Sequence, residues 1–146
     1  MKKTILTLLL FCSTISNTYS QEWHTDFETV KKIAVKEHKA IVLVFQGSDW
    51  CAPCIKLDKN IWSSQEFISS YSEHFVLLQA DFPRKKKNAL SEEQAQKNKF
   101  LADTYNKNGY FPLVVVLDAK GTVLGETGYK KTTPNDYLQS LIAFLD

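Results

Sequence analysis

The chain has 146 residues, of which 44% are hydrophobic, so it is long enough to bury one core without help from disulfides or metals. Its formal charge is +2 at pH 7, but without Lys2 and Lys3 the 18 basic residues become 16, against 16 acidic ones. This balance gives no indication of nucleic acid or an anionic membrane surface as a partner, and we expect neither.

Residues 1–20 have the pattern of a secretory signal. Two lysines precede an apolar run from Ile5 to Cys12, and a polar stretch then ends at Ser20 with small residues placed as signal peptidase requires. The apolar run is too short to span a bilayer as a permanent helix. We therefore expect residues 1–20 to be removed and residues 21–146 to form one periplasmic or secreted domain.

Cysteine usage agrees with export. Cys12 leaves with the signal, and the remaining pair, Cys51 and Cys54, is an even number, which fits an oxidising or redox-managed compartment. Bacterial lipoproteins also acylate a cysteine that ends an apolar run, but Phe11 stands where such signals carry a small residue. Lipoprotein anchoring through Cys12 is the weaker alternative, and it would change the location without changing the chemistry.

The mature sequence alternates helical and strand patterns. Thr25 and Glu28 form a capping box for a first helix, and Pro53 suits the first turn of a second helix, where its missing N–H costs nothing. In chain order we expect a helix over 26–37, a central buried strand over 40–45, a helix that begins at the cysteine pair and kinks or is recapped at Ser63-Ser64, and a second buried strand over 75–82.

The second half continues this pattern after a basic run. We interpret Arg84-Lys85-Lys86-Lys87 as a solvated loop rather than an anion site, because the mature chain has no net charge. The turn sequence Asp118-Ala119-Lys120-Gly121 joins two strands as a hairpin. We expect a helix from Ser91 that Gly109 stops, strands over 113–117 and 122–127, and a last helix opened by Thr133-Pro134.

The order of these elements predicts an α/β fold. Helical crossovers between the early strands imply parallel pairing, and the hairpin adds antiparallel strands. No internal repeat or low-complexity linker divides the chain. We expect one domain with a mixed central sheet of four to five strands, flanked by helices on both faces.

Three roles are open to Cys51 and Cys54. A structural disulfide between them would stabilise little because it closes one of the smallest loops, although residues three apart at a helix start can bond, with Cα atoms about 5 to 6 Å apart. A zinc site needs about four ligands, and the three histidines are scattered. Copper delivery by the pair lacks a methionine or histidine placed to assist. We therefore expect no metal and no cofactor besides the dithiol itself.

A redox couple has a direct mechanism at this position. Cys51 stands at a helix start, where unpaired N–H groups and the positive end of the helix dipole favour its thiolate and should lower its pKa. Cys54 lies inside the first turn, so we expect an exposed nucleophile and a shielded resolving cysteine. Lys56 adds positive potential and Asp49 opposes it, while an ordinary solvated role stays open for both.

At this point the sequence resembles the thioredoxin family, specifically its exported bacterial members. The resemblance rests on the buried strand A-I-V-L-V-F, the loop G-S-D-W-C-A-P-C with the helix after it, and G-Y-F-P-L-V-V-V-L-D ahead of a hairpin and a final helix. It covers most of residues 26–145. Trp-Cys-x-Pro-Cys in that setting is far more specific than a bare Cys-x-x-Cys pair.

The resemblance implies functions for three residues outside the pair. Pro112 is expected to be cis and to pack beside the cysteines, and the main chain of Phe111 to pair with a substrate peptide. Trp50 is expected to shield the disulfide and to offer an apolar docking surface. From the residues alone, Pro112 is a proline that opens a strand, and Trp50 is a core side chain.

Several features depart from the family pattern. Thioredoxins usually carry a buried acid on the strand before the motif, and Val44 and Phe45 stand there instead, so we expect proton transfer to be slower or to pass through water. The residue after Pro112 is leucine where threonine is common, and the lysine-rich insertion is longer than in compact members. Only residues 22–24 remain for the family's first strand.

The sequence thus predicts a thiol-disulfide oxidoreductase that exchanges electrons with protein disulfides, with Cys51 attacking and Cys54 resolving. Ala52-Pro53 is close to the Gly-Pro of reducing thioredoxins and lacks the histidine of oxidising and isomerising relatives, so we expect the reducing direction. We expect a monomer whose partners are protein thiols and disulfides and an upstream redox partner. A disulfide isomerase and a non-catalytic protein-binding module are the alternatives.

Overall fold

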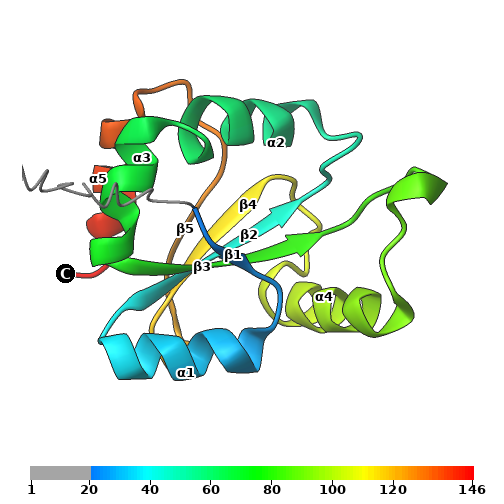
Figure 1. Ribbon diagram of the computed structural model, residues 1–146, viewed down its shortest axis with the longest axis horizontal. Helices are drawn as coiled ribbons and strands as arrows, with labels where there is room; N and C mark the ends of the chain where they lie inside the picture. The colour runs from blue at the N-terminus through cyan, green and yellow to red at the C-terminus, as the bar shows by residue number, and fades with distance from the viewer. Residues whose placement is uncertain (1–20) are drawn as a thin grey trace, which may run out of the picture.

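A computed structural model describes residues 21–146, so the expected signal and the lipoprotein alternative at Cys12 lie outside the described residues. Its strands form one sheet in the order β1-β3-β2-β4-β5 (Figure 1). The strands are β1 (Trp23–His24), β2 (Ala40–Gln46), β3 (Phe75–Asp81), β4 (Leu113–Leu117) and β5 (Val123–Thr127). β1, β3 and β2 are parallel, whereas β4 is antiparallel to both β2 and β5. The mixed five-stranded sheet with β2 at its centre confirms the predicted fold class.

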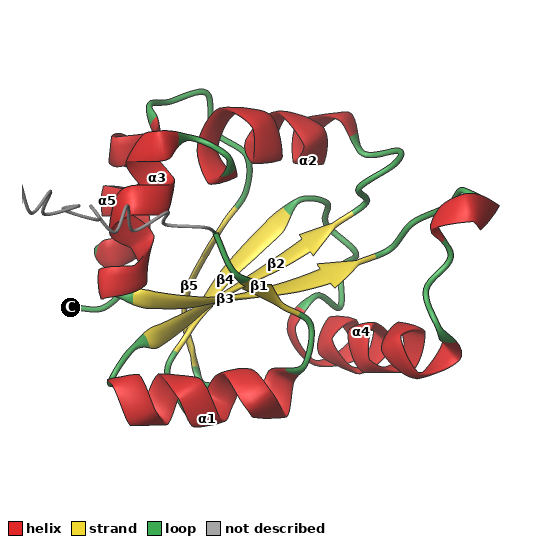
Figure 2. Cartoon of the chain, in the orientation of Figure 1, coloured by secondary structure: helices red, strands yellow, loops and turns green. Residues whose placement is uncertain are grey.

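Helices cover both faces of this sheet (Figure 2). They are α1 (Phe27–Glu37), α2 (Ala52–Leu57), α3 (Gln65–Ser70), α4 (Glu92–Tyr105) and α5 (Pro134–Ile142). The alternation of side chains along β2 separates two cores: Val42 and Val44 face α2, α3 and α5, whereas Leu43 and Phe45 face α1 and α4. Within residues 21–146, no helix has the length and apolar character needed to cross a membrane.

Polar side chains fix where the helices begin. Ser64, Ser91 and Thr133 each accept a hydrogen bond from the main-chain N–H three residues later, at 3.1 to 3.3 Å, which confirms these predicted starts. The expected capping box at Thr25 is wrong, because Asp26 caps α1 through Oδ1 at 2.8 Å. A carboxylate gains there from the positive end of the helix dipole, whereas a threonine hydroxyl does not.

The helical segment after the cysteines changes character along its length. α2 continues into a π-helical turn over Asp58–Trp62, and the helical segment ends at Ser63 before α3 begins. The break confirms the predicted kink, whereas the π turn was not expected. Trp62 is 1% exposed and packs edge-on against Trp23 and Tyr137, so the turn is anchored in the core beneath α2.

Candidate active site

The motif at residues 50–54 lies where β2 ends and α2 begins. A tight turn joins the two elements, and in it the main-chain N–H of Cys51 donates to Gly47 O at 2.9 Å. Cys51 is the N-cap of α2, and its Sγ accepts a hydrogen bond from the main-chain N–H of Cys54 at 3.3 Å. A disulfide joins the two cysteines, whose Cα atoms are 5.2 Å apart. The bond therefore forms within a single helical turn, as the spacing allows.

The expected contrast between an exposed Cys51 and a shielded Cys54 is wrong for the disulfide form. Their exposed fractions are 4% and 3%. Their surroundings differ instead, since Cys54 borders a cavity that Cys51 does not reach. The cavity has a volume of about 130 Å³, and its lining consists of Gln46, Ser48, Cys54, Ile55 and Asp58.

This cavity contains a carboxyl group that could replace the buried strand acid of thioredoxins. Val44 and Phe45, at the end of β2, are fully buried among apolar side chains and offer no proton acceptor. Asp58 supplies a carboxyl group from the helix side instead, four residues after Cys54 and thus on the same helical face. We did not single out Asp58 in the sequence, although its spacing from Cys54 was a signal that could have identified it.

Trp50 is fixed by a hydrogen bond and by an aromatic contact. Its Nε1 donates to Phe82 O at 2.7 Å, just beyond the end of β3. The ring centroid lies 5.4 Å from that of Phe111, which in turn packs edge-on against Phe82 at 5.5 Å. Gly47 makes room for the indole, because a Cβ there would lie 2.2 Å from the ring. Trp50 is therefore part of an aromatic cluster beyond the carboxyl ends of β2 and β3 rather than a core side chain.

Asp49 binds the segment that follows β3. Its carboxylate accepts hydrogen bonds from the main-chain N–H groups of Arg84 at 2.9 Å and Lys85 at 3.0 Å, and from Asn88 Nδ2 at 2.8 Å. The Arg84 and Asn88 bonds are the main causes that hold the pKa of Asp49 below its usual value. The Asp49 carboxylate thus joins the active-site loop to the basic run, a role that was not expected from the sequence. Its effect on the potential at Cys51 stays a prediction.

Arg84 adds a second contact between these segments. Its guanidinium carbon lies 3.6 Å from the centroid of the Trp50 ring, which is the geometry of a cation–π interaction. The interpretation of residues 84–87 as a plain solvated loop is therefore incomplete. Their side chains are exposed, as expected, but their backbone is held against the motif.

The Phe111–Pro112 peptide bond is cis, as the resemblance implied. The loop before this bond is held by Asn106, which is 5% exposed. Its Oδ1 accepts from Tyr110 N at 2.9 Å, and its Nδ2 donates to Tyr110 O at 2.8 Å. Asn106 also ends α4, so the expectation that Gly109 stops this helix is wrong, and Gly109 lies in the turn beyond. Sequence reasoning missed Asn106, whose only signal was an asparagine just after the last apolar helical position.

The remaining predicted support residues surround the disulfide at the surface. Ala52 and Pro53 are exposed in the first turn of α2, where proline has no N–H to satisfy. Lys56 is also exposed and forms no ion pair with any carboxylate in residues 21–146. The expected role of these three residues in supporting the active site stays a prediction.

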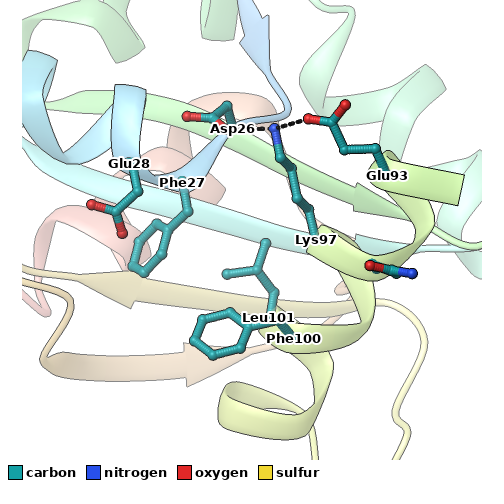
Figure 3. A pocket seen from close by; sticks show the side chains of 8 residues that line it. Asp26, Phe27, Glu28, Glu93, Lys97, Phe100 and Leu101 are labelled. Carbon is teal, nitrogen blue, oxygen red and sulfur yellow. Dashed lines mark hydrogen bonds and ion pairs between the residues drawn. The ribbon is translucent and has the colours of Figure 1, made fainter. Parts of the chain in front are cut away.

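A larger cavity lies away from the cysteines, between α1 and α4 on the opposite face of the sheet (Figure 3). Its volume is about 450 Å³, and Phe27, Phe100 and Leu101 form its apolar part. At its rim, Lys97 Nζ contacts Asp26 at 3.0 Å and Glu93 at 2.9 Å. These ion pairs join the start of α4 to the N-cap residue of α1. Within the described residues, no group of three or more His, Cys, Asp or Glu is placed to hold a metal ion.

Comparisons with known proteins agree with this geometry. The model of a family described as a thioredoxin-like domain matches residues 27–144. The disulfide bond reductase DsbH of Chlamydia pneumoniae is 38% identical over 109 residues, which are 75% of this chain and 63% of that protein. The thioredoxin-related protein DsbJ of the same organism is 28% identical over 81 residues, 53% of this chain and 23% of that one. The chain thus spans less than two thirds of either relative.

Solved structures show the same fold. A DsbH oxidoreductase structure superimposes with a TM-score of 0.79 at 30% identity, covering 99% of this chain and 94% of that one. A thioredoxin from Thermus thermophilus has a TM-score of 0.62 at 15% identity, with 86% and 88% covered. The second likeness concerns the fold alone.

Proposed function

Because the chain belongs to the thioredoxin-like domain family, we propose that it is a thiol-disulfide oxidoreductase that reduces protein disulfides through Cys51 and Cys54. The observation that carries the proposal is the Cys51–Cys54 disulfide, formed within one turn at a helix start, with the Cys54 N–H directed at the Cys51 sulfur. A bond that closes so small a loop contributes little to stability, which is consistent with a bond that is made and broken.

The reaction begins with the reduced pair. The Cys51 thiolate attacks one sulfur of a substrate disulfide, forms a mixed disulfide, and displaces the other substrate sulfur as a thiolate that takes up a proton. The Cys54 N–H, 3.3 Å from the Cys51 sulfur in the disulfide form, stabilises the attacking thiolate. Cys54 then loses its proton and attacks the Cys51 sulfur, which releases the second substrate sulfur. Two electrons have passed from the pair to the substrate.

The cavity beside Cys54 offers a route for its proton. A volume of about 130 Å³ has room for several water molecules at about 30 Å³ each, and the cavity has polar groups to bind them. A water relay would carry the Cys54 proton to the Asp58 carboxylate in the resolving step. Asp58 would then do the work of the strand acid that Val44 and Phe45 replace.

The direction of transfer rests on the residues between the cysteines. Ala52 and Pro53 place no histidine beside Cys51, so no imidazolium stabilises the thiolate and makes the disulfide strongly oxidising. The matched relative named as a disulfide bond reductase supports the same direction. We expect a reduction potential nearer to about −270 mV than to about −120 mV, and a potential above about −150 mV would reverse the direction.

Substrate contacts and location complete the proposal. Trp50, Phe111 and the cis peptide at Pro112 form the surface against which a substrate peptide docks, a role supported by their common aromatic cluster. A signal in residues 1–20, a single domain over residues 21–146, an exported location, a monomeric state and an upstream electron donor also belong to this proposal.

Cys54→Ser tests the mechanism directly. The variant should accumulate mixed disulfides through Cys51, because nothing resolves them, and the complexes should disappear on treatment with dithiothreitol. The matched control is Cys51→Ser/Cys54→Ser, which should trap nothing. Complexes that persist in the double variant would favour a non-catalytic binding module, and faster refolding of a scrambled disulfide protein than of a reduced one would favour an isomerase.

A further inference from the structure

The basic run at residues 84–87 follows the end of β3 (Figure 1), and its main chain is bound to the loop that carries the cysteines. Asp49 accepts hydrogen bonds from the main chain of Arg84 and Lys85, and the Arg84 guanidinium lies over Trp50, the residue before Cys51. The bonds to Asp49 use main-chain N–H groups, so they fix the path of the backbone and leave the lysine ammonium groups exposed.

The positive charge of this run is not neutralised by direct contact. None of the four side chains forms an ion pair with a carboxylate in the part of the chain that the structure describes. Asp49 is the one described carboxylate that contacts the run, and it offsets one of the four positive charges from the backbone side. Glu93 pairs with Lys97 instead, at 2.9 Å. Three lysine side chains are therefore exposed in a segment that is bound to the active-site loop through Asp49, and the Arg84 guanidinium lies over Trp50.

On the basis of the proposed oxidoreductase function, we infer that the basic run selects substrates whose disulfide lies in an acidic polypeptide segment. The patch is short, and residues 21–146 are balanced in charge overall, which fits a few carboxylates close to the reacting sulfur better than an extended polyanion. Exposed charges act over a Debye length of about 8 Å at physiological salt, so carboxylates within about two to three residues of the substrate cysteine are in range.

Three disulfide peptides test the inference. They share one sequence around the cysteines and carry four flanking Glu, four Gln or four Lys residues. The rate constant for reduction by the pre-reduced protein is measured for each at 20 mM and 500 mM NaCl. Wild type should reduce the Glu peptide about tenfold faster than the Gln peptide at low salt and the Lys peptide more slowly still, and the differences should shrink at high salt.

Two charge-matched variants locate the effect. Lys85→Gln/Lys86→Gln/Lys87→Gln keeps Arg84 on Trp50 and should reduce the three peptides at rates within about threefold of one another. Lys32→Gln/Lys36→Gln/Lys120→Gln removes three exposed lysines from α1 and the β4–β5 turn and should retain the wild-type preference.

The results separate this inference from the proposed function. Equal rates for the three peptides with wild type, or an equal loss of preference in both variants, would overturn the inference while leaving the reductase standing. Failure to reduce any peptide would overturn the proposed function itself. Lysine-dependent binding to vesicles containing anionic phospholipid, without a peptide preference, would assign the patch to a membrane surface and overturn the inference.

Discussion

Gly47→Ala tests whether the position of Trp50 organises the active-site loop. A Cβ on Gly47 would lie 2.2 Å from Cε2 of the indole, so the ring would have to leave its place. The backbone itself accepts alanine, because Gly47 is not among the residues with positive φ. The cost of the substitution should therefore come through Trp50 and not through the turn.

The contacts that the ring loses set the magnitude. The Nε1 hydrogen bond to Phe82 O contributes about 1 kcal/mol. The contact with Phe111 contributes about 1 kcal/mol, and the cation–π contact with Arg84 contributes about 0.5 to 1 kcal/mol at an exposed site. We expect Gly47→Ala to lower the free energy of unfolding by about 2 to 3 kcal/mol.

Urea unfolding followed by far-UV circular dichroism measures this cost in two backgrounds. In Trp50→Ala the ring is absent, so adding Gly47→Ala should cost less than about 0.5 kcal/mol. Gly109→Ala is the control, because a Cβ there meets no atom within 4 Å but φ is 67°, and it should cost about 1 to 2 kcal/mol in either background. An equal cost of Gly47→Ala with and without the Trp50 ring would refute the reasoning.

Two further predictions concern carboxyl groups. Asp58→Asn should slow release of the mixed disulfide by about tenfold, and more so as the pH falls, because the Cys54 thiol loses its proton acceptor. Rapid acid quenching measures the release, and Glu66→Gln is the control. Unchanged release in Asp58→Asn would remove Asp58 from the mechanism. The hydrogen bond from the main-chain N–H of Thr29 is the largest of the effects that hold the pKa of Asp26 well below its usual range. The unfolded state therefore takes up this proton first, so the contribution of Asp26 to stability is complete above about pH 4 and is lost as the pH falls toward the folded-state pKa. Asp26→Asn can still cap α1 but does not titrate, so the stability difference between the two proteins in urea unfolding should be largest at pH 7 and should shrink by pH 2.5, and a constant difference would contradict the assignment.

The features that could be predicted are those with local signals. A helix cap joins residues three apart, so Ser64, Ser91 and Thr133 could be identified from the sequence. The buried strands could be identified because a strand covered on both faces is continuously apolar, as residues 40–45 are. Local signals fail where two candidates compete, which is why Thr25 rather than Asp26 was expected to cap α1.

The features that could not be predicted depend on distant contacts. In the sequence, Asn106 looks like an ordinary helix end, and only the folded loop brings the main chain of Tyr110 within hydrogen-bond distance of it. The equal burial of Cys51 and Cys54 depends on the chain that folds around the start of α2, which the spacing of the two cysteines does not determine. Asp49 gives no sign in the sequence that it binds a segment 35 residues further along the chain.

That separation has a structural cause, which is the parallel register of β2 and β3. Every pair in the register, from Ala40 with Phe75 to Gln46 with Asp81, is offset by 35 residues, and Asp49 and Arg84 continue the same offset beyond the ends of the strands. A shift by one residue would turn the buried side chains of a strand to the opposite face, so the core holds the offset fixed. Because the core sets this register, it also sets which segment binds Asp49, two residues before Cys51, and that segment is the basic run. Substrate selection by charge would then follow from strand pairing as much as from the loop sequence itself.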